Sequence, residues 1–211
     1  MTTRSEMIRQ SLSQGPTQVQ QLIEKLGISQ PTVSRALTVM GDDIVRIGAG
    51  PSIQYTLRDT RRGFSTVPIY RITCEGRVEP LGDLVPVYPD GFVMVRAGKP
   101  GLHSDGLPWW LFDMRPQGYL GRAWASKYAG ELSLPTNPEH WADADVVRAL
   151  LAHGHDAIGN LLIGEQARDR FLGMQEPTSV ERATAFPVLA LAASAGEAPG
   201  SSAGGEQPKF C

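Results

Sequence analysis

The stretch that decides the fold is Val19-Gln-Gln-Leu-Ile-Glu-Lys-Leu-Gly-Ile-Ser-Gln-Pro-Thr-Val-Ser-Arg-Ala-Leu-Thr-Val-Met40. Its first half carries apolar residues at the i, i+3, i+4, i+7 spacing of one helix face: Val19, Leu22, Ile23 and Leu26. Thr17 is the expected N-cap of this helix, and Gly27 stands where a glycine ends it. A second helix is expected from Ser29, with Val33, Ala36, Leu37 and Met40 as its apolar stripe. The sequence predicts two helices joined by a very short turn.

The residues around this pair of helices predict a winged helix over residues 1–62. An earlier helix over residues 4–12 supplies Met7 and Ile8 as packing partners. After the pair, residues 44–48 and 53–57 read as short strands, because Ala49-Gly-Pro-Ser52 between them is a turn cluster. Three helices followed by a hairpin are the elements of that fold.

The second helix of such a unit lies in the major groove of DNA. When its apolar stripe faces the core, the side chains between the stripe positions face outward. Gln30 can form a bidentate bond with a base edge, and Arg35 can reach guanine or a phosphate. The residues expected to contact double-stranded DNA are Ser29, Gln30, Pro31, Thr32, Ser34, Arg35, Thr38 and, from the hairpin, Arg46.

Two further arginines and one alternative belong to this interpretation. Arg61 and Arg62, after the hairpin, are candidates for contact with the DNA backbone. The alternative is a winged helix used for protein contact or dimerisation. Residues 29–37 resemble the recognition helix of bacterial winged-helix regulators, and a homodimer is expected because such operators commonly consist of two half-sites.

The composition bounds the remaining classes. With 41% hydrophobic and 20% charged residues, the chain is globular, which excludes disordered and fibrous proteins. No stretch approaches the roughly 18 apolar residues of a membrane span, and no apolar signal begins the chain, so a cytoplasmic protein without membrane contact is expected. Cys74 and Cys211 are too few for a disulfide framework or a cysteine-rich zinc site.

Charge divides unevenly along the chain. Residues 1–62 carry 8 Lys and Arg against 5 Asp and Glu, a balance of +3, whereas residues 63–211 carry 12 against 17, a balance of −5. Any polyanionic partner is therefore expected at the N-terminal segment.

Residues 63–195 predict a second, small α+β domain. Residues 58–65 are polar and have no periodicity, so they are expected to form a linker. The runs at residues 68–74 and 91–96 predict a β-meander, with turn signals at Gly76, Gly82 and Pro89-Asp-Gly91. A helix is expected over residues 143–152, where most apolar side chains lie on one side.

Two groups of side chains in this domain are expected to be structural. The aromatic residues are expected to fill its core rather than stack on bases, namely Trp109, Trp110, Phe112 and Trp124. The histidines lack partners at metal-ligand spacing, so a surface role is expected for His103, His140, His153 and His155. No metal site is predicted in this chain.

The C-terminal segment, residues 196–211, is rich in glycine. Gly200 and Gly205 have the spacing of a phosphate-binding loop, but Glu206-Gln207 follow where Lys-Ser or Lys-Thr is required, so this is no Walker A motif. Gly200-Ser-Ser-Ala-Gly-Gly-Glu-Gln-Pro-Lys209 resembles the Gly-rich loop of HipA-family serine/threonine kinases, the toxins of type II toxin-antitoxin systems. Residues 112–118 and 154–159 resemble two further segments of that family, in the same order. The alternative is a flexible Ala/Gly/Ser linker.

The resemblance implies roles for residues of the loop. It implies a nucleotide-binding loop that includes Ser201, Ser202, Gly204, Gly205, Gln207 and Lys209. A loop serine is autophosphorylated in the family, and Ser202 is the preferred candidate over Ser201. ATP and magnesium are implied for the intact kinase, whose catalytic Asp and metal ligands follow the loop, so no catalytic residue and no cofactor are expected within this chain. Asp156 to Asn160 imitates a catalytic loop but is one residue too short.

The sequence thus predicts an α+β chain. A winged helix-turn-helix domain is followed by a small HipA-like N-terminal kinase subdomain, and the chain is cut off after the Gly-rich loop without the catalytic lobe. Its expected action is operator binding combined with a regulatory kinase subdomain, and the chain alone is expected to be inactive as a kinase. Two alternatives remain: an antitoxin-like regulator that binds a separate kinase core, and a winged-helix regulator that senses a small molecule.

Overall fold

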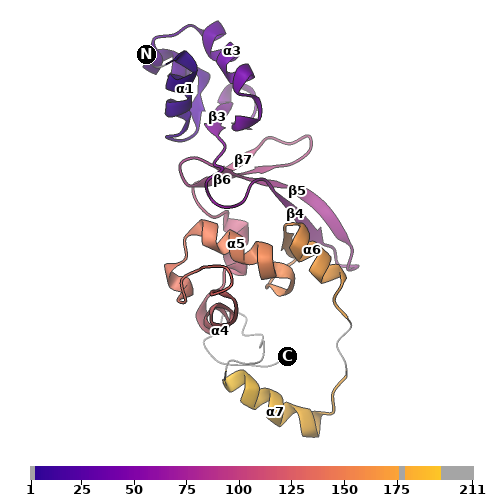
Figure 1. Ribbon diagram of the computed structural model, residues 1–211. Coiled ribbons are helices and arrows are strands. Elements are labelled where there is room, and N and C mark those ends of the chain that lie inside the picture. The colour runs from indigo at the N-terminus through magenta and orange to yellow at the C-terminus, as the bar shows by residue number, and fades with distance from the viewer. Residues whose placement is uncertain (1–2, 176–178, 196–211) are drawn as a thin grey trace. The chain divides into compact units, whose positions relative to one another are not determined.

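The computed structural model describes residues 3–175 and 179–195 (Figure 1). The chain forms two compact units, residues 1–109 and 110–211. The helices of the first unit are α1 (Arg4–Leu12), α2 (Val19–Leu26) and α3 (Gln30–Met40), with short 3-10 turns at Gly41–Asp43 and Gly50–Ser52. Its strands are β1 (Thr17–Gln18), β2 (Ile44–Ile47), β3 (Gln54–Leu57), β4 (Val67–Ile72), β5 (Val78–Val87), β6 (Gly91–Val95) and β7 (Leu102–Ser104).

The three N-terminal helices pack around one apolar core, as the sequence predicts. Ile8, Leu22 and Val33 contribute side chains from α1, α2 and α3 that are fully buried. Gly27 ends α2 in the left-handed conformation, with φ of 63°, and its amide donates to the carbonyl of Ile23. Gly27 can adopt this conformation without a steric cost, so α2 ends at once and the turn to α3 is short.

The start of α2 differs from the prediction. Gln18, not Thr17, is the N-cap, and its amide donates to the side chain of Gln21. Thr17 is drawn into β1, where it pairs with Tyr55 of β3. The strand order β1-β3-β2 completes the winged helix. Backbone pairing with β3 thus decides the role of Thr17, and local sequence could not show it.

The β-meander is confirmed, but its central strand was missed. Strands β4 to β7 pair antiparallel in the order β7-β6-β5-β4. Gly82, expected in a turn, lies inside β5 at a register shift opposite Ile69 and Tyr70. A Cβ at Gly82 would overlap the carbonyl oxygen of Val95, so glycine permits the close approach of β6.

Residues 58–65 do not form a free linker, because they are hydrogen-bonded both to the winged helix and to the β-meander. Arg58 donates from its backbone amide to the carbonyl of Asp43 and from its side chain to the carbonyl of Asp42. Asp59 is 2% exposed, and its amide donates to the carbonyl of Pro86 in β5. An apolar cluster of Val45, Ile47, Val85, Val87 and Val93 joins the wing to the meander. The winged helix and the meander consequently form one compact unit, while the predicted module boundary after residue 62 stays a prediction.

The second unit is mainly helical. Its described residues form the helices α4 (Gly118–Tyr128), α5 (Asp143–His153), α6 (Glu165–Leu172) and α7 (Arg182–Ser194), together with the strand β8 (Leu161–Ile163). Short 3-10 helices span Trp109–Met114, Pro138–His140 and Gly154–Asp156. The predicted helix over residues 143–152 is confirmed as α5, whose Val146, Val147, Ala149 and Leu150 are buried.

The aromatic core prediction is only partly right. Trp124 packs edge-on against Trp141, which is 3% exposed, at a ring distance of 5.4 Å. Trp109 and Phe112, in contrast, are 73% and 55% exposed. Only two of the large side chains in the 3-10 helix Trp109–Met114 are buried, Leu111 and Met114, so the aliphatic residues of this turn take the core positions.

Candidate nucleic-acid interface

The outward face of α3 is mostly polar and exposed. Val33, Ala36 and Met40 turn toward the core. On the opposite side, the predicted DNA-contacting side chains of this segment are exposed, except for the half-buried Thr32: Ser29, Gln30, Pro31, Ser34, Arg35 and Thr38. The structure thus presents together the residues that the sequence grouped, although it does not test their roles.

The first turn of α3 follows from its local sequence. Ser29 is the N-cap in an extended conformation, and its carbonyl accepts from the amides of Thr32 and Val33 at 3.0 and 3.1 Å. Pro31 sits in the first turn, where a missing N–H costs nothing. The hydroxyls of Ser29 and Thr32 lie 3.0 Å apart. Because the first turn holds no acidic residue, the positive end of the helix dipole favours a phosphate there.

Two exposed arginines of the winged helix carry positive charge. Arg35, on α3, is exposed, and so is Arg46, on β2, between the buried Val45 and Ile47. Within the described residues, neither side chain forms a hydrogen bond or ion pair with the rest of the chain. Thr38, one turn after Ser34, donates its hydroxyl to the Ser34 carbonyl at 3.0 Å, so its oxygen can still accept a bond.

Arg62, expected at the DNA backbone, is instead used inside the protein. Its side chain is 9% exposed, its Nε donates to Asp59 at 3.0 Å, and its Nη2 donates to the carbonyl of Val87 at 2.6 Å. Arg61 also bonds to Asp59 but keeps 65% of its side chain exposed, and its guanidinium lies 4.2 Å from the ring centre of Tyr88. The candidate for backbone contact from this segment is therefore Arg61 alone.

Asp59 holds these two arginines together as an ionised group. Burial would raise the pKa of its carboxyl, but the hydrogen bonds from Arg61 and Arg62 outweigh burial and leave that pKa below the ordinary 3.8. The resulting ion pair fixes the segment between the wing and the meander. Because the two donors are adjacent in sequence, the Asp-x-Arg-Arg order was a visible signal for this pairing.

Val39 was not singled out in the sequence, yet it is 81% exposed. It lies four positions after Arg35, so both occupy the same side of α3. At the C-terminal end of the helix, Asp42 and Asp43 add negative charge, and Asp43 pairs with Arg9 of α1 at 2.6 Å. The polarity of the surface therefore runs from a positive, phosphate-compatible N-terminus to an acidic C-terminus.

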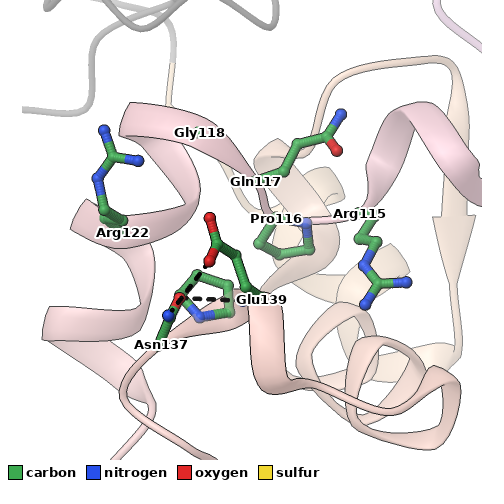
Figure 2. Close-up of a pocket in the computed structure, with 8 residues that line it drawn as sticks. Arg115, Pro116, Gln117, Gly118, Arg122, Asn137 and Glu139 are labelled. Atoms are coloured by element: carbon green, nitrogen blue, oxygen red, sulfur yellow. Dashed lines mark hydrogen bonds between the residues drawn. The ribbon is translucent and has the colours of Figure 1, made fainter.

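The second unit has a small polar cavity of about 110 Å³ beside the start of α4 (Figure 2). Residues 115–118, from the segment that carries the family resemblance, form one wall, and residues 137–139 form another. The side chain of Asn137 accepts from the amide of Glu139 at 3.1 Å. Arg115 donates to the carbonyl of Trp141 at 2.7 Å and faces Asp143 at 3.6 Å. Polar groups of the cavity wall are thus engaged within the unit, Arg115 with the carbonyl of Trp141 and Glu139 with Asn137.

The histidines are less exposed than expected, apart from the exposed His140. His153 is 8% exposed in its side chain and stacks on Tyr128 with ring centres 3.9 Å apart. Burial and the charge of Arg170 lower its pKa below the ordinary 6.5, and Arg170 donates to its Nδ1 at 3.0 Å. Stacking and burial therefore overturn the surface role predicted for His153, and His103 and His155 are likewise half-buried. Among the described residues, no group of three or more His, Cys, Asp or Glu side chains is placed to hold a metal ion.

Two models of known protein families match this chain. Residues 64–172 match the family model of the YjjJ-like toxin middle domain, which is more than half of the chain. The chain belongs to the YjjJ-like toxin family. Residues 2–43 match the helix-turn-helix model of bacterial regulatory proteins of the arsR family.

Toxin YjjJ of Escherichia coli is 39% identical to this chain over 204 residues. The match covers 94% of this chain but 46% of the E. coli protein, so the chain spans less than half the length of that relative. No solved structure matches the chain.

An N-terminal helix-turn-helix joined to a YjjJ-like toxin domain is thus established, whereas membership of the HipA kinases stays a prediction. The Gly-rich loop residues, Ser201 to Lys209, lie outside the described residues, so the predicted nucleotide site is not tested. No helix within residues 3–175 and 179–195 is long and apolar enough to cross a bilayer.

Proposed function

We propose that the winged helix of this YjjJ-like toxin binds double-stranded DNA by placing α3 in the major groove. The observation that carries the proposal is the exposed polar face of α3, with Gln30 and Arg35 outside the core and no acidic side chain in the first turn. Ser29, Thr32 and Ser34 would contact phosphates or base edges, and Arg46 would contact the flanking backbone. Binding as a homodimer to two half-sites is part of the proposal.

Fluorescence anisotropy tests it with a labelled duplex from the promoter region of the chain's own gene and a scrambled duplex of equal length. Arg35→Ala should weaken promoter binding by about tenfold, since each specific base contact contributes about 1–3 kcal/mol. Arg71→Ala is the matched control, because Arg71 is an exposed arginine of β4 away from α3. Equal affinities of the two variants across a salt titration would remove α3 from the interface.

For the whole protein, we propose phosphoryl transfer from ATP to a Ser or Thr hydroxyl of a protein substrate, with ADP and a proton as the other products. The proposal is supported by the resemblance of residues 112–118, 154–159 and 200–209 to the HipA kinases, and by the toxin name of the E. coli relative. Magnesium and ATP would be held with the help of Gly204, Gly205, Gln207 and Lys209, and catalytic residues would come from outside this chain.

Mass spectrometry of the full-length E. coli protein, incubated with ATP and magnesium, tests this activity. Phosphate on the serine that aligns with Ser202, lost when that serine is alanine, is the expected result. Absence of both phosphoprotein and ADP release would contradict it.

A second candidate function is that this chain acts as a regulatory part that binds a separate toxin core. The observation that favours it is the exposed apolar helix α7, described next. The cavity beside α4 does not favour a small-molecule sensor, since its volume of about 110 Å³ is smaller than the roughly 300–1,000 Å³ of ordinary ligand pockets.

A further inference from the structure

Large apolar side chains are exposed in one stretch of the chain more than in any other described part. Six of the twelve that stand exposed lie between residues 172 and 191: Leu172, Met174, Val180, Phe186, Val188 and Leu191. Scattered apolar residues on a surface need no explanation, but a concentration of this kind marks a contact surface.

Helix α7 carries the most exposed members of this group. After Arg182 it has no charged residue, and its sequence Phe-Pro-Val-Leu-Ala-Leu-Ala-Ala is apolar on every side. Val188 and Leu191 are 66% and 73% exposed, and with Thr184 they form one stripe, which we call the α7 face. A helix that is apolar all round is ordinarily buried in a protein core. Helix α7 therefore has the composition of a buried helix although its α7 face is exposed.

One end of α7 is attached to the second unit. Ala193 is 1% exposed, and the hydroxyl of Tyr119 from α4 donates to its carbonyl oxygen. The attachment involves the last turn, whereas the α7 face lies before it. Among residues 3–175 and 179–195, the helix is thus held at its last turn, while the α7 face is left exposed.

Two other occupants fit the α7 face less well. A helix of 13 residues is about 20 Å long, shorter than the roughly 30 Å of a bilayer core. A helix that lies on a membrane surface needs a strongly polar face opposite the apolar one, and α7 has none. Nucleic acid is disfavoured because Arg182 is the sole basic side chain of the helix.

We propose that the α7 face is the docking surface for the half of a YjjJ-like toxin that lies outside the matched region. More than half of the E. coli relative is not covered by this chain, so a further body of sequence exists in the family that this chain does not contain. The proposal rests on the second candidate function, that the chain works with a toxin core, and is independent of DNA binding by α3.

Cysteine labelling with a maleimide tests the proposal on two existing proteins, this chain and the full-length E. coli relative. Leu191→Cys is introduced here in a background with Cys74→Ser and Cys211→Ser, and the aligned substitution is made in a cysteine-free relative. Leu102→Cys is the matched control, because Leu102 is an apolar residue of β7 that is 48% exposed in the first unit. Circular dichroism confirms that each variant is folded.

The expected result is fast labelling of Leu191→Cys in this chain and labelling slower by about tenfold or more at the aligned position of the full-length relative, because access limits the thiol reaction. The control position should react alike in both. Equal rates at the aligned positions would overturn the proposal without bearing on α3. Leu191→Cys of this chain could instead be labelled slowly at high concentration and faster on dilution. That result would also overturn the proposal, since a second copy of the chain would then cover the α7 face.

A second variant keeps the test independent of cysteine chemistry. Val188→Glu should leave the melting temperature of this chain unchanged, since the side chain is exposed, while the aligned substitution should lower that of the full-length relative. A full-length protein that tolerates the charge would count against docking at the α7 face.

Discussion

Helices α3 and α7 are similar in length but differ in how their side chains match their surroundings. In α3, Val33, Ala36 and Met40 are buried and the polar side chains are exposed. In α7, apolar side chains occupy every side, and Val188 and Leu191 remain exposed. The difference shows that the apolar face of α3 is covered within the described residues, whereas the apolar side chains of α7 are left uncovered there, which is the basis of the proposed docking surface.

The largest loss of stability is expected when a side chain is removed from the core of the winged helix. Leu22→Ala should lower the free energy of unfolding by about 2–5 kcal/mol, because Leu22 is fully buried among α1, α2 and α3 and its loss leaves a cavity. Urea denaturation followed by circular dichroism measures the change. A loss below about 1 kcal/mol would mean that Leu22 is no better packed than an exposed side chain of the α7 face.

The next effect concerns the junction of wing and meander. Asp59→Asn should cost about 1.5–3 kcal/mol, because it weakens charge-assisted bonds from Arg61 and Arg62 to a carboxyl whose side chain is 3% exposed. Asp43→Asn serves as the control, since its pair with Arg9 is about half exposed and such pairs contribute about 0–1 kcal/mol. If both substitutions cost the same, the junction is not the rigid connection that its contacts indicate.

The same carboxyl predicts a pH dependence. Its pKa is lower in the folded chain than the ordinary 3.8, so its contribution to stability is present above that value and is lost as pH falls through the folded pKa. Thermal melts of the wild type should therefore lose stability below about pH 4 more steeply than those of Asp59→Asn. Parallel curves for the two proteins would show that Asp59 does not titrate as described.

On the exposed face of α3, Gln30→Ala should reduce discrimination between the promoter duplex and a scrambled duplex by about tenfold, the value of one bidentate contact with a base. Gln166→Ala, at an exposed glutamine of α6, should leave the ratio of the two affinities unchanged. Gln30 would lose its proposed role if both variants kept the wild-type ratio.

The smallest effect is expected on α7. Leu191→Ala should change the unfolding free energy of this chain by about 0.5 kcal/mol or less, because 73% of the residue is exposed already. The same urea denaturation that reports on Leu22→Ala compares the two leucines directly. A cost similar to that of Leu22→Ala would show that the α7 face is covered within the chain.

Local signals predicted much of the first unit. The helix over residues 4–12, the end of α2 at Gly27, the start of α3 after Ser29 and both wing strands are confirmed. These features depend on periodicity, caps and turn residues within a few positions of one another. The exposed face of α3 followed from the same periodicity, since burial of Val33 and Ala36 fixes the direction of the side chains between them.

The errors share one physical origin, which is contact between distant residues. Pairing with β3 removed Thr17 from its predicted cap, and the approach of Val95 made Gly82 a strand residue. The polar residues around Asp59 read as a linker because their partners, Pro86 and Val87, lie about 25 positions later in the chain.

The sequence by itself determined the elements of the winged helix and the face of α3 that is offered to a partner, because both depend on the spacing of apolar residues along one helix. Only the tertiary structure decided that Arg62 is buried beside Asp59, that His153 stacks on Tyr128, and that the apolar side chains of α7 are left exposed. Whether a side chain is covered depends on atoms brought close by folding, and spacing along the chain carries no record of them.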